Sequence, residues 1–249
     1  MSEPLSSKVV IILGGSGGIG AATARRLAAA GARVVVTARD DIGKASSVID
    51  SLSGTGHLAA TAVVTNSAAL DALAMQVRAT YGRADILVNT AGFTKAVPHA
   101  DLDALTDELI DEIMRVNWRA QFASIRAFRS LLEESGNGLV VNVSSISGST
   151  GMGSNVAYCA AKAGLDVMAA SLGRALAPHI RVLNVSPGAV DTGFVPGRGA
   201  DFNEKVAATT PLRRIGMPDD IAAAIEACAT HLTFSTGSTI VVDGGRRLN

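Results

Sequence analysis

Short apolar runs alternate with longer alanine-rich segments along almost the whole chain. The apolar runs are rich in β-branched residues and lie at 8–13, 32–38, 59–64, 84–90, 138–145, 180–186 and 238–243. Helical patterns fill the intervals at 18–31, 67–81, 103–134, 154–177 and 218–230. Strands that are apolar along their whole length are typical of a parallel sheet that helices cover on both faces. This order predicts one doubly wound α/β domain over residues 1–249, with seven parallel strands.

The charge and cysteine content argue against several classes of function. Lysine plus arginine and aspartate plus glutamate number 22 each, so the zero net charge favours neither a nucleic-acid nor an anionic-membrane partner. No stretch approaches the roughly 18 apolar residues of a membrane span, and no secretion signal is recognisable. The histidines are scattered, and Cys159 and Cys228 form no C-x-x-C pair, so no metal site is predicted. We expect a cytoplasmic protein with reduced thiols.

A glycine-rich loop, LGGSGGIG, directly follows the first apolar run and opens the first helix. Two templates fit it: G-x-G-x-x-G through Gly15, Gly17 and Gly20, and G-x-x-x-G-x-G through Gly14, Gly18 and Gly20. In both, glycines allow a tight turn and bring backbone N–H groups close to a pyrophosphate at a helix N-terminus. Between a strand and a helix, this loop predicts dinucleotide binding by a Rossmann domain.

The end of the second apolar run bears on which dinucleotide is bound. An NAD site usually has a carboxylate here that accepts hydrogen bonds from the ribose hydroxyls. This chain reads VVVTARD, with Ala38 at the expected carboxylate position and Arg39 next. A guanidinium can pair with the 2′-phosphate of NADP, although a shift of one residue would restore a carboxylate at Asp40. We predict NADP(H) in preference to NAD(H).

One of the two tyrosines, Tyr158, stands four residues before Lys162 in the segment AYCAAKAG. On a helix this spacing places both side chains on one face. A nearby ammonium favours the phenolate and lowers the pKa of a tyrosine, which is otherwise about 10. The pair therefore suits an enzyme that must exchange a proton while a nicotinamide carries the hydride. A surface tyrosine–lysine pair is the alternative when the motif is taken alone.

Together with several other motifs, this pair makes the chain resemble the short-chain dehydrogenase/reductase family over nearly its whole length. The matching segments are Gly18-Ile19-Gly20, NTAG at 89–92, Asn117 in MRVNWRA, Ser145 thirteen residues before Tyr158, the Y-x-x-x-K pair, and SPGAVDT at 186–192. The segments PLRRIGMPDDIA and GSTIVVDGG also match. Within the family, the general form is most similar to 3-oxoacyl-(acyl-carrier-protein) reductases.

The resemblance implies four catalytic residues. Tyr158 would be the general acid in reduction and the base in oxidation, and Lys162 would lower its pKa and hold the nicotinamide ribose. Ser145 would hydrogen-bond the substrate oxygen, and Asn117 would help to hold a water that links Lys162 to solvent. Adjacent Ser144 fits the spacing less well than Ser145.

The resemblance also implies contacts to the cofactor. Thr192 and the backbone at Val190 would bind the carboxamide, and Asn89 and Gly92 would line the adenosine side. The expected cofactor-binding set is Gly14, Ser16, Gly18, Ile19, Gly20, Arg39, Val64, Asn89, Ala91, Gly92, Tyr158, Lys162, Pro187, Gly188, Val190 and Thr192.

Two positions depart from the family pattern. Leu13 stands where the family commonly has a threonine whose hydroxyl ties the glycine loop to the N-A-G turn. Val63 stands where an aspartate often accepts a hydrogen bond from the adenine amine. Because both changes remove hydrogen bonds on the cofactor side only, we expect weaker cofactor binding and intact catalysis.

Substrate specificity is expected to depend on residues 190–215, which mix glycine, proline and short helical patterns like a mobile lid. The candidate pocket walls are Phe93, Met152, Phe194 and Phe202. The arginines that either meet an anionic substrate or face water are Arg198, Arg213 and Arg214.

These features predict an NADP(H)-dependent oxidoreductase that transfers hydride between nicotinamide and a carbonyl or secondary alcohol. A 3-oxoacyl thioester is one candidate substrate. One alternative is an NAD-dependent alcohol or sugar dehydrogenase that uses Asp40. Another is a non-catalytic nucleotide-binding protein, against which the complete set of four catalytic residues argues.

A homotetramer is expected from the helical stretches 103–134 and 154–177, which carry apolar residues on more than one side. A helix packed on one sheet needs only one apolar face, so the second face indicates another buried contact. The last apolar run would also be a sheet edge that needs cover. The resemblance implies 222 symmetry, and a monomer with broadly apolar helices is the alternative.

Overall fold

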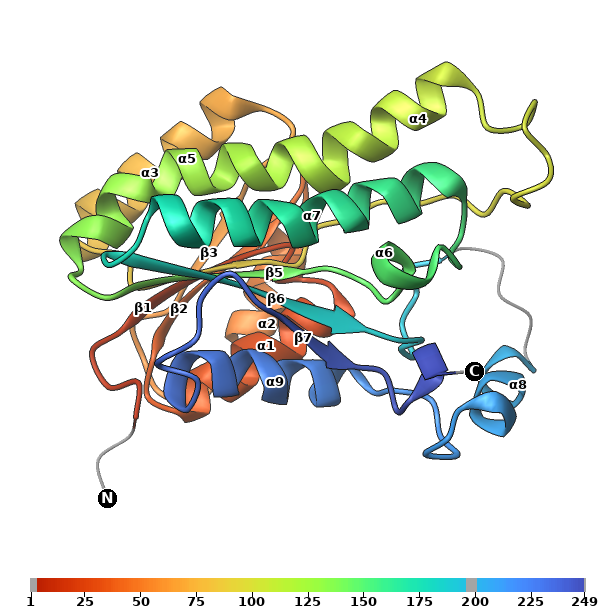
Figure 1. The fold of residues 1–249 in the computed structure, drawn as a ribbon. Coiled ribbons are helices and arrows are strands. Elements are labelled where there is room, and N and C mark those ends of the chain that lie inside the picture. The colour runs from red at the N-terminus through yellow and green to blue at the C-terminus, as the bar shows by residue number, and fades with distance from the viewer. Residues whose placement is uncertain (1–3, 196–200, 249) are drawn as a thin grey trace.

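The structure, a computed structural model, describes residues 4–195 and 201–248. Its centre is a parallel sheet of seven strands in the order β3-β2-β1-β4-β5-β6-β7 (Figure 1). The strands are β1 (Val9–Leu13), β2 (Arg33–Ala38), β3 (Leu58–Thr61), β4 (Ile86–Asn89), β5 (Gly138–Val143), β6 (Ile180–Pro187) and β7 (Thr239–Val242). This confirms the predicted doubly wound sheet. The strand order reverses between β1 and β4, where such sheets open a crevice at the carboxyl ends of their strands.

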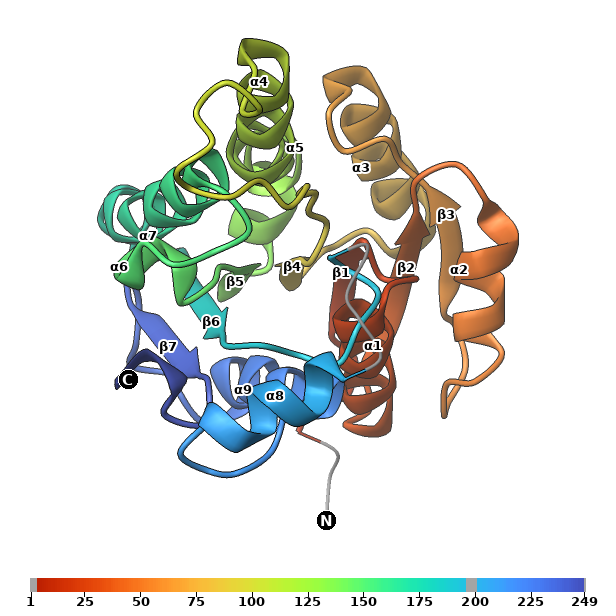
Figure 2. The same ribbon diagram turned by 90° about the vertical axis from the view of Figure 1, so that its right-hand side faces the viewer.

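Helices cover both faces of the sheet (Figure 2). The helices are α1 (Gly18–Ala29), α2 (Ile42–Ile49), α3 (Ser67–Tyr81), α4 (Asp107–Met114), a π-helical turn (Arg115–Arg119), α5 (Ala120–Glu134), α6 (Ser147–Thr150), α7 (Val156–Ala175), α8 (Phe202–Thr209), α9 (Pro218–Thr230) and a 3-10 turn (Arg246–Leu248). One core layer joins α1, α2 and α9 to the sheet, and another joins α3, α5 and α7 to the opposite face.

The first strand shows why its sequence is apolar throughout. Val10 and Ile12 pack into the core on the α1 side, and Val9, Ile11 and Leu13 pack into the core on the other side. Alternate side chains of a strand point to opposite faces, so a strand covered on both faces favours apolar residues at successive positions.

Several element boundaries differ from those predicted. The long helical stretch begins at Asp107 rather than at 103, because the Thr106 hydroxyl caps it by accepting a hydrogen bond from the Leu109 N–H at 3.4 Å. A π-helical turn divides that stretch into α4 and α5. The third strand ends at Thr61, not at 64. Helix α2 was not predicted; it begins after Asp41, whose carboxylate accepts from the Gly43 N–H at 2.9 Å.

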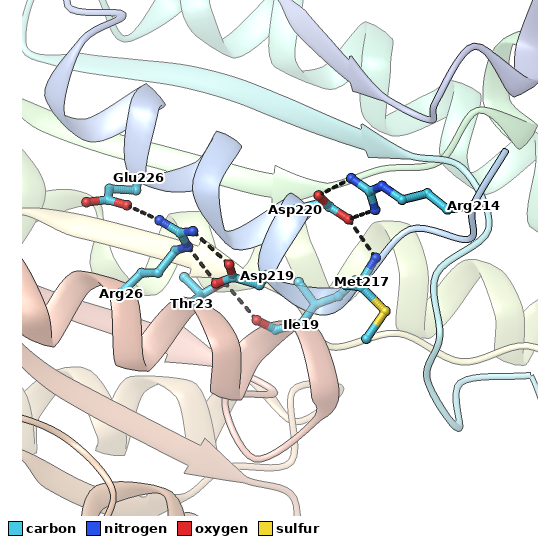
Figure 3. A network of polar contacts seen from close by, with 8 residues as sticks. All are labelled: Ile19, Thr23, Arg26, Arg214, Met217, Asp219, Asp220 and Glu226. Atoms are coloured by element: carbon cyan, nitrogen blue, oxygen red, sulfur yellow. Dashed lines mark hydrogen bonds and ion pairs between the residues drawn. The ribbon is translucent and has the colours of Figure 1, made fainter. Parts of the chain in front are cut away.

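Helices α1 and α9 lie side by side and are joined by ion pairs (Figure 3). The Arg26 guanidinium donates to both carboxylate oxygens of Asp219, at 2.6 and 2.7 Å, and to Glu226 at 3.0 Å. At the start of α9, Asp220 accepts from the Met217 N–H and forms a bidentate pair with Arg214. The segment before α9 is thereby held against the helix N-terminus.

Candidate active site

The glycine loop between β1 and α1 packs tightly against the turn after β4. A Cβ at Gly14, whose φ is +78°, would come within 2.7 Å of the Ala91 backbone nitrogen, and a Cβ at Gly20 would overlap the Gly14 carbonyl. A Cβ at Gly18 would reach 2.9 Å from the Thr192 methyl group, so Thr192 lies directly against the loop. This is a cradle that only glycine permits, at the N-terminus of α1, where N–H groups favour a phosphate.

Two threonine hydroxyls tie this loop in place of the one that is missing at Leu13. The Thr90 hydroxyl, in the turn after β4, donates to the Leu13 carbonyl at 2.8 Å. The Gly14 N–H donates to the Thr37 hydroxyl at 3.1 Å. Leu13 itself is buried in the core, which gives its side chain a packing role.

The end of β2 faces the same cavity. Ala38 and Arg39 line it, and the Arg39 side chain is 78% exposed. Asp40 does not belong to the described lining; its carboxylate accepts from the Arg39 guanidinium at 3.1 Å. Val63 and Val64 line the cavity beyond β3, and Val63 is 41% exposed.

The N-A-G turn supplies its backbone and its threonine to the cavity, but its asparagine points elsewhere. Thr90, Ala91 and Gly92 line the cavity. Asn89 is 2% exposed, and its amide donates to the Asn142 side chain at 2.9 Å inside the sheet. The side chain of Asn89 therefore supports the turn from below, which differs from the prediction that Asn89 lines the adenosine side of the cofactor.

Tyr158 and Lys162 lie in the first two turns of α7. Asn155 caps this helix, because its side-chain oxygen accepts from the Tyr158 N–H at 2.7 Å and its amide donates to the Lys95 carbonyl at 2.8 Å. The Lys162 nitrogen is 5.5 Å from the centroid of the Tyr158 ring and donates to the Val143 carbonyl at 2.7 Å. Burial lowers the pKa of Lys162 to about 8. The predicted shared helix face is thus present.

Ser145 follows β5 and lines the cavity with Tyr158. Its hydroxyl lies 3.1 Å from the Ser147 hydroxyl, to which it is hydrogen-bonded, and it accepts from the Ser147 N–H at 3.2 Å. Ser144 also borders the cavity, but its buried hydroxyl donates to the Lys162 carbonyl at 3.3 Å. Ser144 therefore holds α7 to β5, and Ser145 is the better placed of the two for substrate.

Asn117 lies in the π-helical turn and is completely buried. Its amide donates to the carbonyls of Phe93 at 2.7 Å and Ile113 at 2.9 Å, and its oxygen accepts from the Phe93 N–H at 3.3 Å. These bonds fix the chain just after the N-A-G turn. Asn117 is not among the described cavity-lining residues, and its predicted role in holding a water stays a prediction.

The turn after β6 completes the cavity and begins the predicted lid. Pro187, Gly188, Val190 and Thr192 all line the cavity. Val190 pairs with Gly216 in an isolated parallel bridge, so the two ends of the segment 190–215 are fastened together at its base. The Phe194 ring reaches back over Tyr158, with ring centroids 6.1 Å apart.

These residues surround one continuous cavity of about 1650 Å³. Its apolar walls include Phe93, Met152, Phe194 and Phe202, as expected from the sequence. The Arg213 guanidinium donates to the Ala208 carbonyl, Arg214 is paired with Asp220, and Arg198 lies outside the described residues.

Sequence reasoning missed several residues at this site. They include Ser147, which contacts Ser145, Asn155, which caps α7, and Arg246, which lines the cavity from near the end of the chain. Only Asn155 carried a usable signal, since an asparagine just before an apolar periodic run is a typical helix cap.

The described residues hold no group of three or more histidine, cysteine, aspartate or glutamate side chains able to bind a metal ion. They also include no helix that is long and apolar enough to cross a membrane. Cys159 and Cys228 are both buried, and burial raises the pKa of each thiol. Cys159 therefore packs beside Tyr158, as expected, and is not an activated nucleophile.

Comparison with known proteins gives matches along the whole chain. A family described as enoyl-(acyl carrier protein) reductase matches residues 14–247. Ketoacyl reductase 2 of the granaticin polyketide synthase of Streptomyces violaceoruber is 38% identical over 242 residues, which are 96% of each chain. The 3-oxoacyl-(acyl-carrier-protein) reductase FabG of Escherichia coli is 33% identical over 240 residues, again 96% of each chain.

A solved structure agrees with the sequence matches. A short-chain dehydrogenase/reductase of Burkholderia xenovorans superimposes with a TM-score of 0.91 at 35% identity, covering 97% of this chain and 98% of the other. Family, relatives and structure thus coincide over nearly all residues. This protein belongs to the short-chain dehydrogenase/reductase family and is an oxidoreductase similar to 3-oxoacyl-(acyl-carrier-protein) reductases.

Proposed function

We propose that this enzyme reduces a carbonyl compound to a secondary alcohol with NADPH, or catalyses the reverse oxidation, with Tyr158 as the proton donor or acceptor. The observation that carries the proposal is the convergence of two features on one cavity. Tyr158, Lys162 and Ser145 meet there, and the glycine cradle of α1 borders the same space.

The residues around the cavity fit a dinucleotide. A Cβ at Gly14, Gly18 or Gly20 would collide with neighbouring protein atoms, so glycine at these positions lets the loop pack closely and present the N-terminus of α1 to a pyrophosphate. Arg39 favours the 2′-phosphate of NADP, because it borders the cavity and its guanidinium is largely exposed. Ala38 offers no carboxylate, and Asp40 is engaged by Arg39. These facts support NADP(H) over NAD(H).

In this proposal, bound NADPH supplies the hydride, and the chain supplies position and the proton. The Ser145 hydroxyl donates a hydrogen bond to the substrate carbonyl oxygen and is itself oriented by Ser147. The Tyr158 hydroxyl transfers its proton to that oxygen as negative charge develops there. The Lys162 ammonium stabilises the resulting phenolate from the same helix face, and its bond to Val143 fixes its position.

A 3-oxoacyl thioester is the substrate class that we propose first. Two relatives that span this chain are named as a ketoacyl reductase and a 3-oxoacyl-(acyl-carrier-protein) reductase. The cavity walls near Tyr158 are apolar and aromatic, as an acyl chain requires. Residues 190–215 would act as the lid, because their described part places Phe194 against Tyr158 and its ends meet at Val190 and Gly216.

The test is a Tyr158→Phe variant assayed for NADPH oxidation with a panel of ketones and 3-oxoacyl thioesters. Turnover should fall at least about a hundredfold, the usual scale of general acid–base catalysis, while NADPH binding is retained. The chain's other tyrosine, Tyr81, provides the matched control. It is the last residue of α3, its hydroxyl donates to the Gly56 carbonyl, and it is not among the described cavity-lining residues. Tyr81→Phe should retain turnover; full activity of Tyr158→Phe would reject the assignment.

A homotetramer in the cytoplasm is the expected form of the enzyme. Apolar side chains are exposed on α5 and α7, where Phe122 is 37%, Val156 is 46% and Val167 is 70% exposed. Large apolar side chains exposed on these two helices are what a subunit interface would cover. The two cysteines are unpaired, as is usual in a reducing compartment. Light scattering at micromolar concentration should give four times the chain mass, and a fully active monomer would contradict the assembly.

A further inference from the structure

Three asparagines form a buried ladder across the middle of the sheet. Asn89, Asn142 and Asn184 occupy aligned positions on β4, β5 and β6. The Asn89 amide donates to the Asn142 oxygen at 2.9 Å, and the Asn142 amide donates to the Asn184 oxygen at 3.0 Å. All three side chains are buried, so the ladder has a fixed direction in which each amide faces the next oxygen.

The ladder ends at a carboxylate on the helix that carries Tyr158 and Lys162. The Asn184 amide donates to one oxygen of Asp166 at 3.0 Å, and to the Leu165 carbonyl at 2.9 Å. The Thr239 hydroxyl, on β7, donates to the same Asp166 oxygen at 3.1 Å. Side chains from β6 and β7 therefore fix the position of the Asp166 carboxylate on the side of α7 that faces these strands.

Asp166 stands four residues after Lys162, which places the carboxylate on the helix face that bears the lysine. Burial penalises the Lys162 ammonium, whose single described hydrogen bond is to the Val143 carbonyl. An ammonium in such a place remains charged only if a nearby group compensates for the lost water.

The other elements packed against this part of α7 supply little charge. Strand β5 has no charged side chain, and α6 has the uncharged sequence SGST. Strand β6 carries Arg181, whose guanidinium donates to the carbonyls of Cys228, Leu232 and Ser235. Helix α4 and the π-helical turn bring Glu112 and Arg115 to the cavity wall, where they lie 3.6 Å from each other. On α7 itself the titratable neighbours are Tyr158 and Cys159. Asp166 is thus the anion that acts on Lys162 among the described residues.

We propose that Asp166 is a positioning residue that keeps Lys162 charged, acting through a carboxylate fixed by Asn184 and Thr239. The inference rests on the proposed function, in which the Lys162 ammonium supports the Tyr158 phenolate. Two opposing influences set the lysine: burial lowers the pKa of Lys162, and the negative charge of Asp166 raises it, to leave it at about 8. Without Asp166, the pKa of Lys162 would fall further, and a larger part of the enzyme would hold a neutral lysine at pH 7.

The direct test is an NMR titration of Lys162 in the chain without cofactor, labelled with ¹³C at the lysine ε carbons. The chain has only five lysines, and Lys162→Arg identifies the resonance. In Asp166→Asn, which keeps an oxygen to accept from Asn184 and Thr239, the pKa of Lys162 should fall by about half a unit or more. Asp71→Asn, which removes an exposed carboxylate from α3, is the matched control and should leave it unchanged.

Two further variants separate charge from structure. Thr239→Val keeps the charge of Asp166 and removes one hydrogen bond, so Lys162 should titrate near its wild-type midpoint. Asp166→Ser removes the charge with a smaller side chain and should shift the pKa in the same direction as Asp166→Asn, which covers the case in which the asparagine variant folds poorly. Unchanged titration in both Asp166 variants, or an equal shift in Thr239→Val, overturns the proposal.

Loss of the Asp166 charge should also change the pH dependence of catalysis. In Asp166→Asn, the alkaline limb of kcat/KM for NADPH-dependent reduction should move to lower pH by the shift that NMR measures, with KM for NADPH nearly unchanged at low pH. A merely structural role would lower activity equally at every pH. The NMR titration needs no turnover. If the protein shows no reductase activity, the proposed function is wrong, and the titration still decides whether Asp166 acts on Lys162.

Discussion

The Lys162 ammonium donates a 2.7 Å hydrogen bond to the Val143 carbonyl at a point where the lysine is only 3% exposed. Burial lowers its pKa to about 8 from an ordinary value of 10.5. A buried charge of this kind is unfavourable for folding, so the site holds Lys162 at a cost in stability that a purely structural residue would not impose.

Lys162→Met should therefore raise the free energy of unfolding at pH 7 by about 2 kcal/mol while it abolishes turnover. The folded pKa lies below the unfolded one, so between pH 8 and 10.5 the unfolded wild-type chain binds more protons and the wild type gains stability as pH rises. The difference in the free energy of unfolding between Lys162→Met and the wild type should therefore shrink over this pH range. Denaturant unfolding at pH 7 and pH 10 measures both effects, and a methionine variant less stable at pH 7 would contradict the argument.

At the opposite end of the sheet, Asp85 is 1% exposed, and its carboxylate joins the start of β4 to the start of β1. It accepts from the Arg83 guanidinium at 2.6 and 2.9 Å, the Val9 N–H at 2.9 Å and Lys8 at 3.0 Å. Burial alone would raise the pKa of Asp85, but these hydrogen bonds outweigh it and lower the pKa overall. The stability that Asp85 contributes is thus present above the unfolded pKa of about 4 and is lost as pH falls through the folded value.

Asp85→Asn should destabilise the fold by about 2 kcal/mol at pH 7, less than a fully buried pair would lose because Lys8 and Arg83 are partly exposed. The difference from the wild type should begin to shrink as pH falls below about 4 and disappear only below the lower folded pKa of Asp85, where the wild-type carboxylate is also protonated. Urea unfolding across this range provides the measurement. Asp71→Asn should change stability little at any pH, and an equal loss in both variants would show that the ion pairs of Asp85 are not the cause.

Most of the sheet could be predicted because a buried strand consists mainly of apolar residues, which can be recognised in the sequence. Strands covered on both faces are largely apolar, and β1, with the sequence VVIIL, reads that way without knowledge of its partners. The pairing of Tyr158 with Lys162 was also predictable, because helical spacing alone fixes it. Helix α2 was not, since its sequence IGKASSVI has weak helix formers and depends on the Asp41 cap and on burial of Ala45 and Val48.

The asparagine ladder could not be predicted from the sequence pattern, because it depends on how the strands pair. Asn89 was assigned to the cofactor because of its motif, but its side chain faces Asn142 across the sheet. Alternation along a strand gives two possible faces, and only the register of β4 with β5 and β6 determines which polar side chains meet. The same holds for the π-helical turn at Asn117, which no local sequence rule specifies.

Cofactor preference should follow Arg39 and Ala38. Arg39→Ala should raise the Kd for NADPH about tenfold and leave that for NADH nearly unchanged, because only NADPH carries the 2′-phosphate. Ala38→Asp should move the preference toward NADH by adding a ribose-binding carboxylate and by repelling that phosphate. Fluorescence titration with both cofactors measures this directly. If the unmodified enzyme prefers NADH, Asp40 is the ribose partner and the proposed NADP(H) preference is wrong.

The last prediction concerns the base of the lid. Arg214 pairs with Asp220 at 2.6 and 2.7 Å, and Gly216 pairs with Val190, so the end of the segment that holds Phe194 near Tyr158 is fixed to α9. Arg214→Gln should loosen this end and raise KM for the carbonyl substrate roughly threefold, with kcat within about twofold of the wild type.

A matched variant separates the lid from the general effect of losing a surface ion pair. Arg78 makes a similar bidentate pair with Glu134, at 2.8 and 2.9 Å, between α3 and α5 and away from the cavity lining. Exposed pairs of this kind contribute little to stability, so both variants should remain folded at the assay temperature. Arg78→Gln should leave KM unchanged. Equal KM values for Arg214→Gln and the wild type would mean that the Arg214–Asp220 pair does not govern substrate binding, and that other contacts, such as the backbone bridge between Val190 and Gly216, hold the lid.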